Sequence, residues 1–417
     1  MPMQSRQAEE AYAPPCPVYR KCGGCQMQNM SYERQLAWKQ ALVERLLRRY
    51  HPVAPIVGME KPAHYRNKVQ AAFGFDRRRG RILSGVYQSS SHRIVPIDSC
   101  LLEDKTADEI IVTVRKLMES FKLKPYDEDS RTGLIRHVLV KRGFSSGQIM
   151  VVLVASTPIF PARNNFVRAL LKERPDITTI IVNINPYKTS LVLGDSERVL
   201  YGSGYIEDML CGCVFRISAR SFYQINPVQT EKLYTIAMDL AKLTGTETVV
   251  DAYCGVGTIA LVAARRAGRV LGVELNREAV KDAVINAKRN RAENVRFYMA
   301  DAGKFMTDMA AAGERADVVF MDPPRAGSDA AFLSALVTLS PQRVVYISCN
   351  PETQARDLAH LTARGYRVES ICPVDMFPHT HHVETIVLLS KLHSDKHIEV
   401  VLNMDELDLT AAESKAT

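Results

Sequence analysis

The last third of the chain repeats one pattern, a short apolar run of strand type followed by a stretch of helical type. The strand-type runs cover residues 248–254, 269–275, 295–301, 317–322, 343–349, 366–374 and 383–390. Helical stretches separate the first six runs, and this alternation predicts a doubly wound sheet of parallel strands. Only DMFPHTHH stands between the sixth and seventh runs, which is too short for a crossover helix. We therefore predict an antiparallel seventh strand.

The turn after the first of these runs reads DAYCGVGTIA and is typical of a ligand-binding strand end. Gly255 and Gly257 would let the backbone approach a bound ligand, and Glu274 ends the second run, where it would accept from ribose hydroxyls. Six parallel strands with an antiparallel seventh are the architecture of S-adenosylmethionine-dependent methyltransferases. The glycine pattern alone also fits a dinucleotide fingerprint, so a NAD-dependent oxidoreductase stays open at this point.

The next strand ends distinguish these two classes. The fourth run ends in Asp322 followed by two prolines and Arg325, which stiffen the loop and place a carboxylate toward the crevice. The fifth run ends in Ser-Cys-Asn-Pro, which places the thiol of Cys349 at the adjoining strand end. Hydride transfer needs no thiol there, whereas methyl transfer to a pyrimidine carbon does. The pattern favours a methyltransferase.

Four of the nine cysteines form a second candidate site. Cys16, Cys22 and Cys25 stand in CPVYRKCGGC, and Cys100 follows far downstream. In a chain without a secretory signal, grouped cysteines are better explained as metal ligands than as disulfides. Four thiolates without a neighbouring histidine suit either zinc or an iron–sulfur cluster, and their spacing does not decide between these two.

Four motifs in order, DAYCGVGTIAL, MDPPRAG, YISCNPETQARDL and FPHTHHVETIVLL, resemble the RNA uracil-5-methyltransferase family. The segment CPVYRKCGGCQ together with Cys100 resembles the iron–sulfur branch of that family, which acts on 23S ribosomal RNA. The resemblance implies a [4Fe-4S] cluster on Cys16, Cys22, Cys25 and Cys100. The branch that methylates transfer RNA lacks this cluster, so 23S ribosomal RNA is the expected partner and a transfer RNA uridine the alternative.

The resemblance also implies the roles of the site residues. Cys349 matches the nucleophile and Glu384 the general base. The expected S-adenosylmethionine site consists of Gln224, Tyr253, Gly255, Gly257, Thr258, Glu274, Asp301 and Asp322, of which Asp322 could instead touch the uracil edge. The related 5-methylcytosine enzymes carry an added cysteine in the fourth-strand loop, where this chain has Arg325. An RNA-binding protein without catalysis is a further alternative, which the presence of Cys349 and Glu384 disfavours.

The uracil ring itself explains why these two side chains are needed. C5 of uracil is a poor nucleophile, and addition of a thiolate at C6 makes it an enolate carbon. After methylation C5 carries both a methyl group and a proton, and a general base must remove that proton to release the thiol.

The chain divides into five expected parts. Residues 1–30 hold the first cysteines, 31–55 an amphipathic helix packed on the catalytic domain, 56–218 a central α+β RNA-binding domain with few helices, 219–391 the methyltransferase domain, and 392–417 an acidic tail. The formal net charge is +8, and the expected RNA contacts are Arg66, Lys68, Arg136, Lys141 and Arg142. Because no apolar run approaches ~20 residues and the polar start lacks the apolar stretch of a secretory signal, we expect a cytoplasmic protein without a membrane span. We also expect a monomer.

Overall fold

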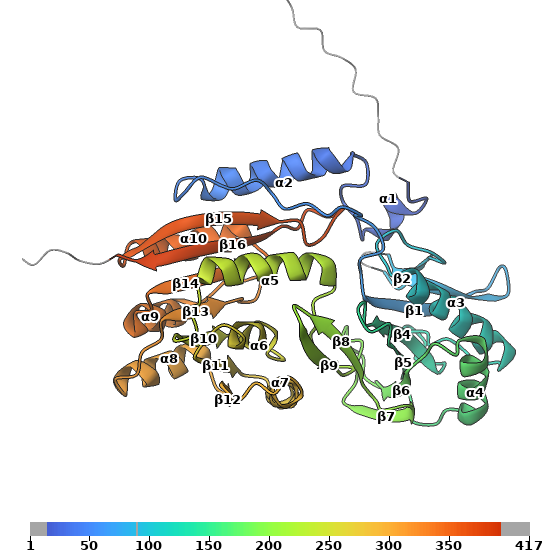
Figure 1. Cartoon of the computed structure of the whole chain (residues 1–417). Helices are drawn as coiled ribbons and strands as arrows, with labels where there is room; N and C mark the ends of the chain where they lie inside the picture. Colours follow the sequence, from blue (N-terminus) through green and yellow to red (C-terminus); the bar gives the residue numbers. More distant parts are fainter. Residues whose placement is uncertain (1–14, 89–90, 393–417) are drawn as a thin grey trace, which may run out of the picture.

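The computed structural model describes residues 15–88 and 91–392, and these residues form two seven-stranded sheets that lie side by side (Figure 1). A short hairpin lies between the two sheets. The expected acidic tail from residue 392 falls, from residue 393 on, outside the described residues, as do the first fourteen residues of the chain.

The first sheet is mixed, with the strand order β3-β2-β1-β4-β5-β6-β7. Its strands are β1 (Lys68–Asp76), β2 (Arg81–Tyr87), β3 (Ile94–Pro96), β4 (Ile135–Arg142), β5 (Ile149–Ala155), β6 (Thr179–Ile184) and β7 (Ser196–Tyr201). β5 and β6 are parallel, and helix α4 (Arg163–Glu173) makes the crossover between them. All other pairings in this sheet are antiparallel.

Helix α3 (Lys105–Ser120) covers one face of the first sheet, and α3 and α4 are the two α-helices among the described residues of this region. The carboxylate of Asp104 caps its first turn by accepting from the backbone N–H of Ala107 at 3.0 Å. Ile110, Val114 and Met118 recur at intervals of four residues and are fully buried. This is the ordinary pattern of an amphipathic helix, which the many strand-like runs around it obscured.

The second sheet has the order β12-β11-β10-β13-β14-β16-β15. Its strands are β10 (Thr248–Ala252), β11 (Arg269–Glu274), β12 (Val295–Met299), β13 (Val318–Met321), β14 (Arg343–Ser348), β15 (Tyr366–Val374) and β16 (Glu384–Lys391). The helices around it are α5 (Pro227–Ala241), α6 (Thr258–Ala264), α7 (Arg277–Arg289), α8 (Ala302–Ala311), α9 (Ala330–Leu339) and α10 (Pro351–Thr362). Six strands run parallel and β16 runs antiparallel to both its neighbours, which confirms the predicted topology.

The N-terminal segment packs on the second sheet. After the short helix α1 (Tyr19–Cys22), helix α2 (Tyr32–Leu47) buries Val43 and Leu47 in the same core as β10 and β13. The chain then makes parallel bridges from Val53 and Val57 to the edge strand β15. The N-terminal segment thereby covers part of the edge that β15 would otherwise expose.

The hairpin of β8 (Ile206–Leu210) and β9 (Cys213–Ile217) joins the two sheets into one packed body. One hydrophobic core contains Met150 of the first sheet, Phe215 of the hairpin and Val249 of the second sheet. This continuous core fixes the first sheet in relation to the strand ends that carry the expected chemistry. No helix among the described residues has the length and apolar character that a membrane span requires.

Candidate active site

Cys349, Glu384 and Asp322 come together at one edge of the second sheet. Cys349 follows β14 directly, Glu384 begins β16, and Asp322 follows β13. β14 pairs with both neighbouring strands, and its last residue, Ser348, lies opposite Thr385 of β16. The strand order therefore brings the expected nucleophile and base, which are 35 residues apart in the sequence, next to each other.

The environment of Glu384 is suited to a base that works near neutral pH. Its side chain is 7% exposed, and burial raises the pKa of the carboxyl group to about 8. Asp322 raises this pKa further, whereas the guanidinium of Arg325 opposes the increase. Burial also raises the pKa of Asp322 to about 7. Two neighbouring carboxyl groups that both have raised pKa values are typical of a functional site.

Arg325 connects the nucleophile to the turn between β15 and β16. Burial raises the pKa of the Cys349 thiol, the neighbouring carboxylates add to the increase, and the charge and hydrogen bond of Arg325 oppose it. Nη2 of Arg325 also lies 2.8 Å from both ring nitrogens of His382. A guanidinium beside Cys349 would stabilise the thiolate that nucleophilic attack requires.

The glycine-rich turn after β10 is shaped for the close approach of a ligand. Gly255 has a φ of +55°, and a side chain there would enter open space. Gly257 has a φ of +84°, and a Cβ atom there would lie 2.7 Å from the ring of Phe297. Both residues thus need the left-handed region that favours glycine. Glu274 holds the turn, because its Oε2 accepts from the backbone N–H of Gly255 at 3.1 Å.

Three other expected cofactor residues lie around this turn. The hydroxyl of Thr258 is 3.1 Å from the hydroxyl of Tyr234, which also hydrogen-bonds to the side chain of Gln224. Tyr253 packs its ring 5.0 Å from that of Phe332. These contacts bring the segment before α5 and the first turn of α6 to the same strand ends.

Asp301 has a visible structural role. Its carboxylate accepts from the backbone N–H of Lys304 at 2.8 Å and caps helix α8. A second oxygen remains on this exposed side chain, so the cap does not prevent contact with a ligand.

The structure adds Asp251 to the residues expected from sequence. This residue opens the DAYCGVG motif and is fully buried. Its Oδ2 accepts from the backbone N–H of Ala260 at 2.8 Å, whereas its Oδ1 has no partner. Burial raises the pKa of this carboxyl group well above its ordinary value. In the sequence, its position at the start of this motif indicates that it belongs to the site.

Large apolar side chains are exposed around the same strand ends. Leu275 directly follows β11 and is 69% exposed, and Met299 ends β12 and is 59% exposed. Phe222, two residues before Gln224, is 66% exposed. Sequence reasoning missed them, although apolar residues at the ends of parallel strands are a recognisable signal. Exposed apolar side chains beside convergent polar groups are typical of ligand sites.

The four expected cluster cysteines are neighbours. Burial raises the pKa of Cys25 to about 12, and the nearby thiols of Cys100, Cys22 and Cys16 act in the same direction. Cys25 and Cys100 also pack against the same small core around Tyr65. Across residues 15–88 and 91–392, however, no three His, Cys, Asp or Glu side chains converge closely enough to hold a metal ion. The four thiols are thus suitable metal ligands and lie near one another, but they are not arranged around a common metal position.

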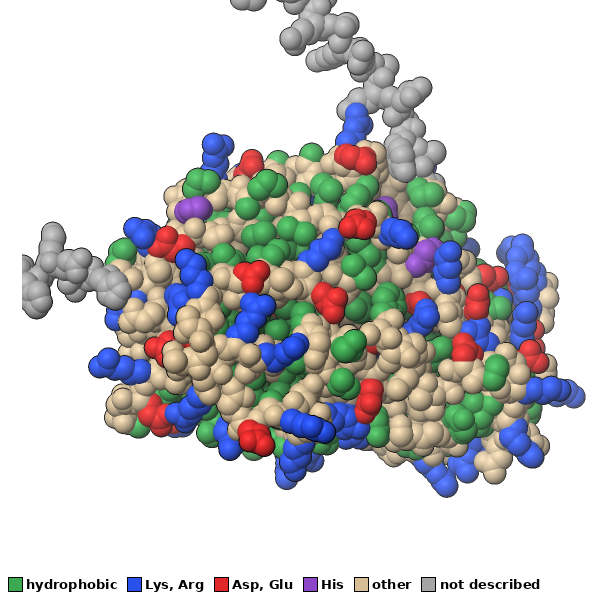
Figure 2. All heavy atoms as spheres, in the orientation of Figure 1, with side chains coloured by type: hydrophobic (Ala, Val, Ile, Leu, Met, Phe, Trp, Pro, Cys, Tyr) green, Lys and Arg blue, Asp and Glu red, His purple; other side chains and the backbone are tan. Residues whose placement is uncertain are grey.

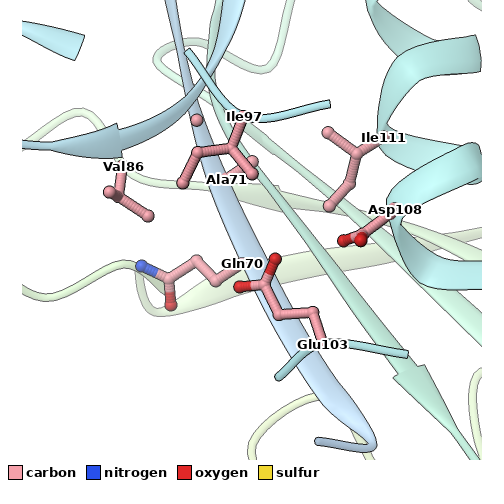
Figure 3. Close-up of a pocket in the computed structure, with 8 residues that line it drawn as sticks. Gln70, Ala71, Val86, Ile97, Glu103, Asp108 and Ile111 are labelled. Atoms are coloured by element: carbon pink, nitrogen blue, oxygen red, sulfur yellow. The ribbon is translucent and has the colours of Figure 1, made fainter. Parts of the chain in front are cut away.

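A small cavity lies between β1 and α3 (Figure 3). Its volume of about 10 Å³ has room for about one water molecule, which excludes a substrate. The carboxyl groups of Glu103 and Asp108 point into this region, and burial raises the pKa of Glu103 to about 8. Oδ2 of Asp108 accepts from the backbone N–H of Cys100 at 2.7 Å. Asp108, which lines the cavity, therefore holds the backbone at Cys100 in place.

A larger hollow of about 480 Å³ opens at the other ends of β14, β15 and β16. Gln342, Arg343, Arg367, Ser390, Lys391 and Leu392 line it. Because it lies beside the first residue of β14 and not the last, it is remote from Cys349. Size alone therefore does not identify the site.

Two of the five expected RNA contacts are buried in the protein. Arg136 is 1% exposed, donates to both oxygens of Glu128 and to the carbonyls of Asn185 and Tyr187, and so stabilises the first sheet. Lys141 is 5% exposed and donates to the carbonyls of Ser218 and Ser221. The expectation that they contact phosphates is wrong, because their cationic groups already have buried partners.

The other three expected contacts differ in their environment. Lys68 is exposed, Arg142 pairs with Asp104 at 2.6 Å, and half-buried Arg66 lies close to Cys22 and Cys25. Figure 2 shows further Lys and Arg side chains at the end of the molecule formed by β1 and β2. Arg77, Arg78, Arg79 and Arg81 are exposed there.

The seven-stranded sheet with β16 antiparallel, the glycine-rich turn after β10 and the polar strand ends together define a class I S-adenosylmethionine-dependent methyltransferase. The family model for tRNA (uracil-5-)-methyltransferases matches residues 31–392. The chain belongs to this family and is an RNA uracil-5-methyltransferase.

Relatives and a solved structure agree with this assignment. The chain is 44% identical over 380 residues to an uncharacterized RNA methyltransferase of Halalkalibacterium halodurans, covering 90% of this chain and 82% of that one. It is 42% identical over 382 residues to one from Bacillus cereus, covering 90% and 83%. The crystal structure of Pyrococcus abyssi tRNA (uracil-54, C5)-methyltransferase with S-adenosyl-L-homocysteine is similar, with a TM-score of 0.76, 29% identity and 88% and 85% coverage.

Proposed function

We propose that this enzyme methylates C5 of a uridine in 23S ribosomal RNA through a covalent bond between Cys349 and C6. The placement of Cys349 beside Glu384 at adjoining strand ends carries the proposal. This chemistry needs a nucleophile and a general base at the same uracil ring. The Cys349 thiol and the Glu384 carboxyl group, whose pKa is raised, can fill these two roles.

We assign the steps as the chemistry of the uracil ring requires. The Cys349 thiolate adds to C6, and the electrons of the C5=C6 bond move toward O4. C5 then takes up the methyl group, which bound S-adenosylmethionine would supply from its sulfonium sulfur as that sulfur–carbon bond breaks and the neutral thioether leaves. The Glu384 carboxylate removes the C5 proton, the double bond forms again, and the C6–S bond breaks to return the Cys349 thiolate. Arg325 stabilises the thiolate before addition and after release.

We assign the cofactor crevice to the turn after β10 and the neighbouring strand ends. The open space at Gly255, the unpartnered Oδ1 of Asp251 and the exposed side chains of Leu275 and Met299 fit a ligand with polar and apolar parts. In this proposal Gln224, Tyr253, Thr258, Glu274, Asp301 and Asp322 line the crevice.

We further propose that Cys16, Cys22, Cys25 and Cys100 would hold a [4Fe-4S] cluster with a structural role. Four neighbouring thiols without histidine suit such a cluster, and small movements of the cysteine segment would complete the set. The expected choice of 23S ribosomal RNA depends on these cysteines.

Transfer RNA is the second candidate substrate. The family description and the Pyrococcus abyssi enzyme, which acts on transfer RNA, favour it. Mass mapping of both RNA classes from cells lacking this protein decides: a uridine in 23S ribosomal RNA should lose about 14 mass units, one methylene group. Loss of the methyl group in transfer RNA alone would contradict our substrate assignment.

Covalent trapping tests the mechanism. RNA with 5-fluorouridine at the target should form an adduct with the wild-type enzyme that survives denaturing electrophoresis, because fluorine cannot leave as a cation. Cys349→Ala should form no adduct and transfer no methyl group. Glu384→Gln should accumulate a methylated adduct on ordinary RNA. Cys372→Ala, at a buried cysteine of β15, serves as the control and should behave as the wild type. Turnover by Cys349→Ala would refute the proposal.

A further inference from the structure

The single tryptophan of the chain lies at the surface of α2 and stacks on a histidine of the turn between β15 and β16. Trp38 is 41% exposed. Its ring centroid lies 5.0 Å from that of His381, which is also exposed, and the two ring planes are tilted by 28°. Figure 2 shows hydrophobic side chains exposed among charged ones over this part of the molecule. Trp and His thus form a flat aromatic pair open to solvent.

This pair is attached rigidly to the site. His381 belongs to the turn between β15 and β16, and Glu384 follows it by three residues. The buried Lys39, next to Trp38 in α2, donates to the carbonyl of Phe377 in this turn at 3.1 Å. Gln35 accepts from the backbone N–H of His379 at 2.9 Å, one helical turn before Trp38. Helix α2 and the turn therefore hold the stack in a fixed position.

The stack is also continuous with the nucleophile. His382 follows His381 and lies 2.8 Å from Arg325, and Arg325 hydrogen-bonds to Cys349. A path of adjacent side chains thus leads from Cys349 over Arg325 and His382 to the aromatic pair. An RNA strand whose target base enters the site would pass along this path with its neighbouring nucleotides.

Unpaired bases in such a strand need partners once they leave their own stack. Aromatic rings supply them in single-stranded RNA recognition, because every base has a π-face. We propose that Trp38 and His381 form a stacking site for a nucleobase that flanks the target uridine. The inference rests on the proposed function, since it assumes that RNA enters at Cys349.

The single tryptophan permits a direct test. Heptauridylate should quench the fluorescence of wild-type protein, since a stacked base contacts the only indole. Heptauridylate with abasic riboses on both sides of the central uridine should bind through its phosphates yet quench much less. Equal quenching by both oligonucleotides would overturn the inference.

Variants test the same site by affinity. Trp38→Leu should weaken heptauridylate binding in fluorescence anisotropy by about 5- to 150-fold, the range expected for one stacked base. Trp38→Phe should retain most of the affinity, and the salt dependence should stay unchanged because no charge is lost. Tyr187→Leu is the matched control, since Tyr187 is 59% exposed and follows β6, far from α2 in Figure 1.

The outcomes separate the two proposals. If the wild-type enzyme forms the 5-fluorouridine adduct but Trp38→Leu binds heptauridylate as tightly as the wild type, the proposed function stands and the stacking site is overturned. This result is expected if the aromatic pair binds a protein instead. Absence of any adduct would contradict the mechanism, whereas base-dependent quenching would still support the stacking site. Thermal unfolding of Trp38→Phe and Trp38→Leu verifies that both variants fold.

Discussion

The ammonium group of Lys39 in α2 lies 2.6 Å from the carboxylate of Asp375, and both side chains are completely buried. Asp375 follows β15 and opens the turn that leads to Glu384. It also accepts from the hydroxyl of Tyr32 at 2.8 Å. This ion pair therefore couples the N-terminal helix to the catalytic base.

Loss of Lys39 should destabilise the protein. Lys39→Met leaves the Asp375 carboxylate buried without its cation, and breaking such a pair costs about 3 to 5 kcal/mol. The free energy of unfolding from urea titration should fall by that amount. Lys281→Met breaks the exposed pair with Glu278 and should change it by less than about 1 kcal/mol. A similar small effect at both positions would show that the buried pair is not structurally important.

Glu384 should make stability depend on pH. Its folded-state pKa of about 8 lies above the ordinary 4.5, so the unfolded chain loses the proton first as pH rises. The contribution of Glu384 to the free energy of unfolding therefore becomes more unfavourable as the pH rises from 4.5 to 8. Glu384→Gln removes this penalty and should stabilise the apoprotein by about 4 kcal/mol at pH 8 but not near pH 4.5. Urea titrations at both pH values measure this, with exposed Glu173→Gln as the control.

The same pKa should control release of the product. Only the ionised carboxylate accepts the C5 proton, so decay of the methylated adduct should accelerate about tenfold per pH unit below pH 8 and level off above it. Rapid-quench measurements of the adduct give this rate. A flat profile between pH 6 and pH 8 would mean that another group removes the proton.

The cysteine segment should bind iron. Anaerobically purified protein should be brown with about four iron atoms per chain, and Cys25→Ser should lose them. Cys213→Ser changes a buried cysteine of β9 outside this group and should retain the iron. Elemental analysis that finds zinc without iron in the wild-type protein would contradict the cluster.

Removing the charge of Lys68 should affect RNA binding, whereas removing that of Arg136 should affect stability. Lys68 is exposed, so Lys68→Ala should weaken RNA binding and reduce the slope of log affinity against log salt by about one unit without affecting the fold. Arg136→Ala removes a buried cation from Glu128 and should lower the unfolding free energy by several kcal/mol. Binding titrations between 50 and 200 mM salt, together with thermal unfolding, distinguish the two effects.

Much of the catalytic half of the protein was predictable because its pattern is local. Alternating strands and helices fix the parallel sheet, and the short DMFPHTHH segment fixes the antiparallel last strand. Asp322 and Cys349 then meet at one edge, since parallel strands end at the same side. Glu384 reaches this edge because it begins the antiparallel strand β16. The sequence by itself thus determined the topology and the residues assembled at the site.

Burial and long-range contacts belong to the tertiary structure. Whether an arginine meets RNA or a buried glutamate depends on distant segments, and so Arg136 and Lys141 were misassigned. The raised pKa of Glu384 likewise arises from burial and from Asp322, 62 residues earlier in the chain. The contact between Trp38 and His381 joins segments more than 300 residues apart. Such contacts require the folded chain, because no local pattern specifies which surfaces will meet.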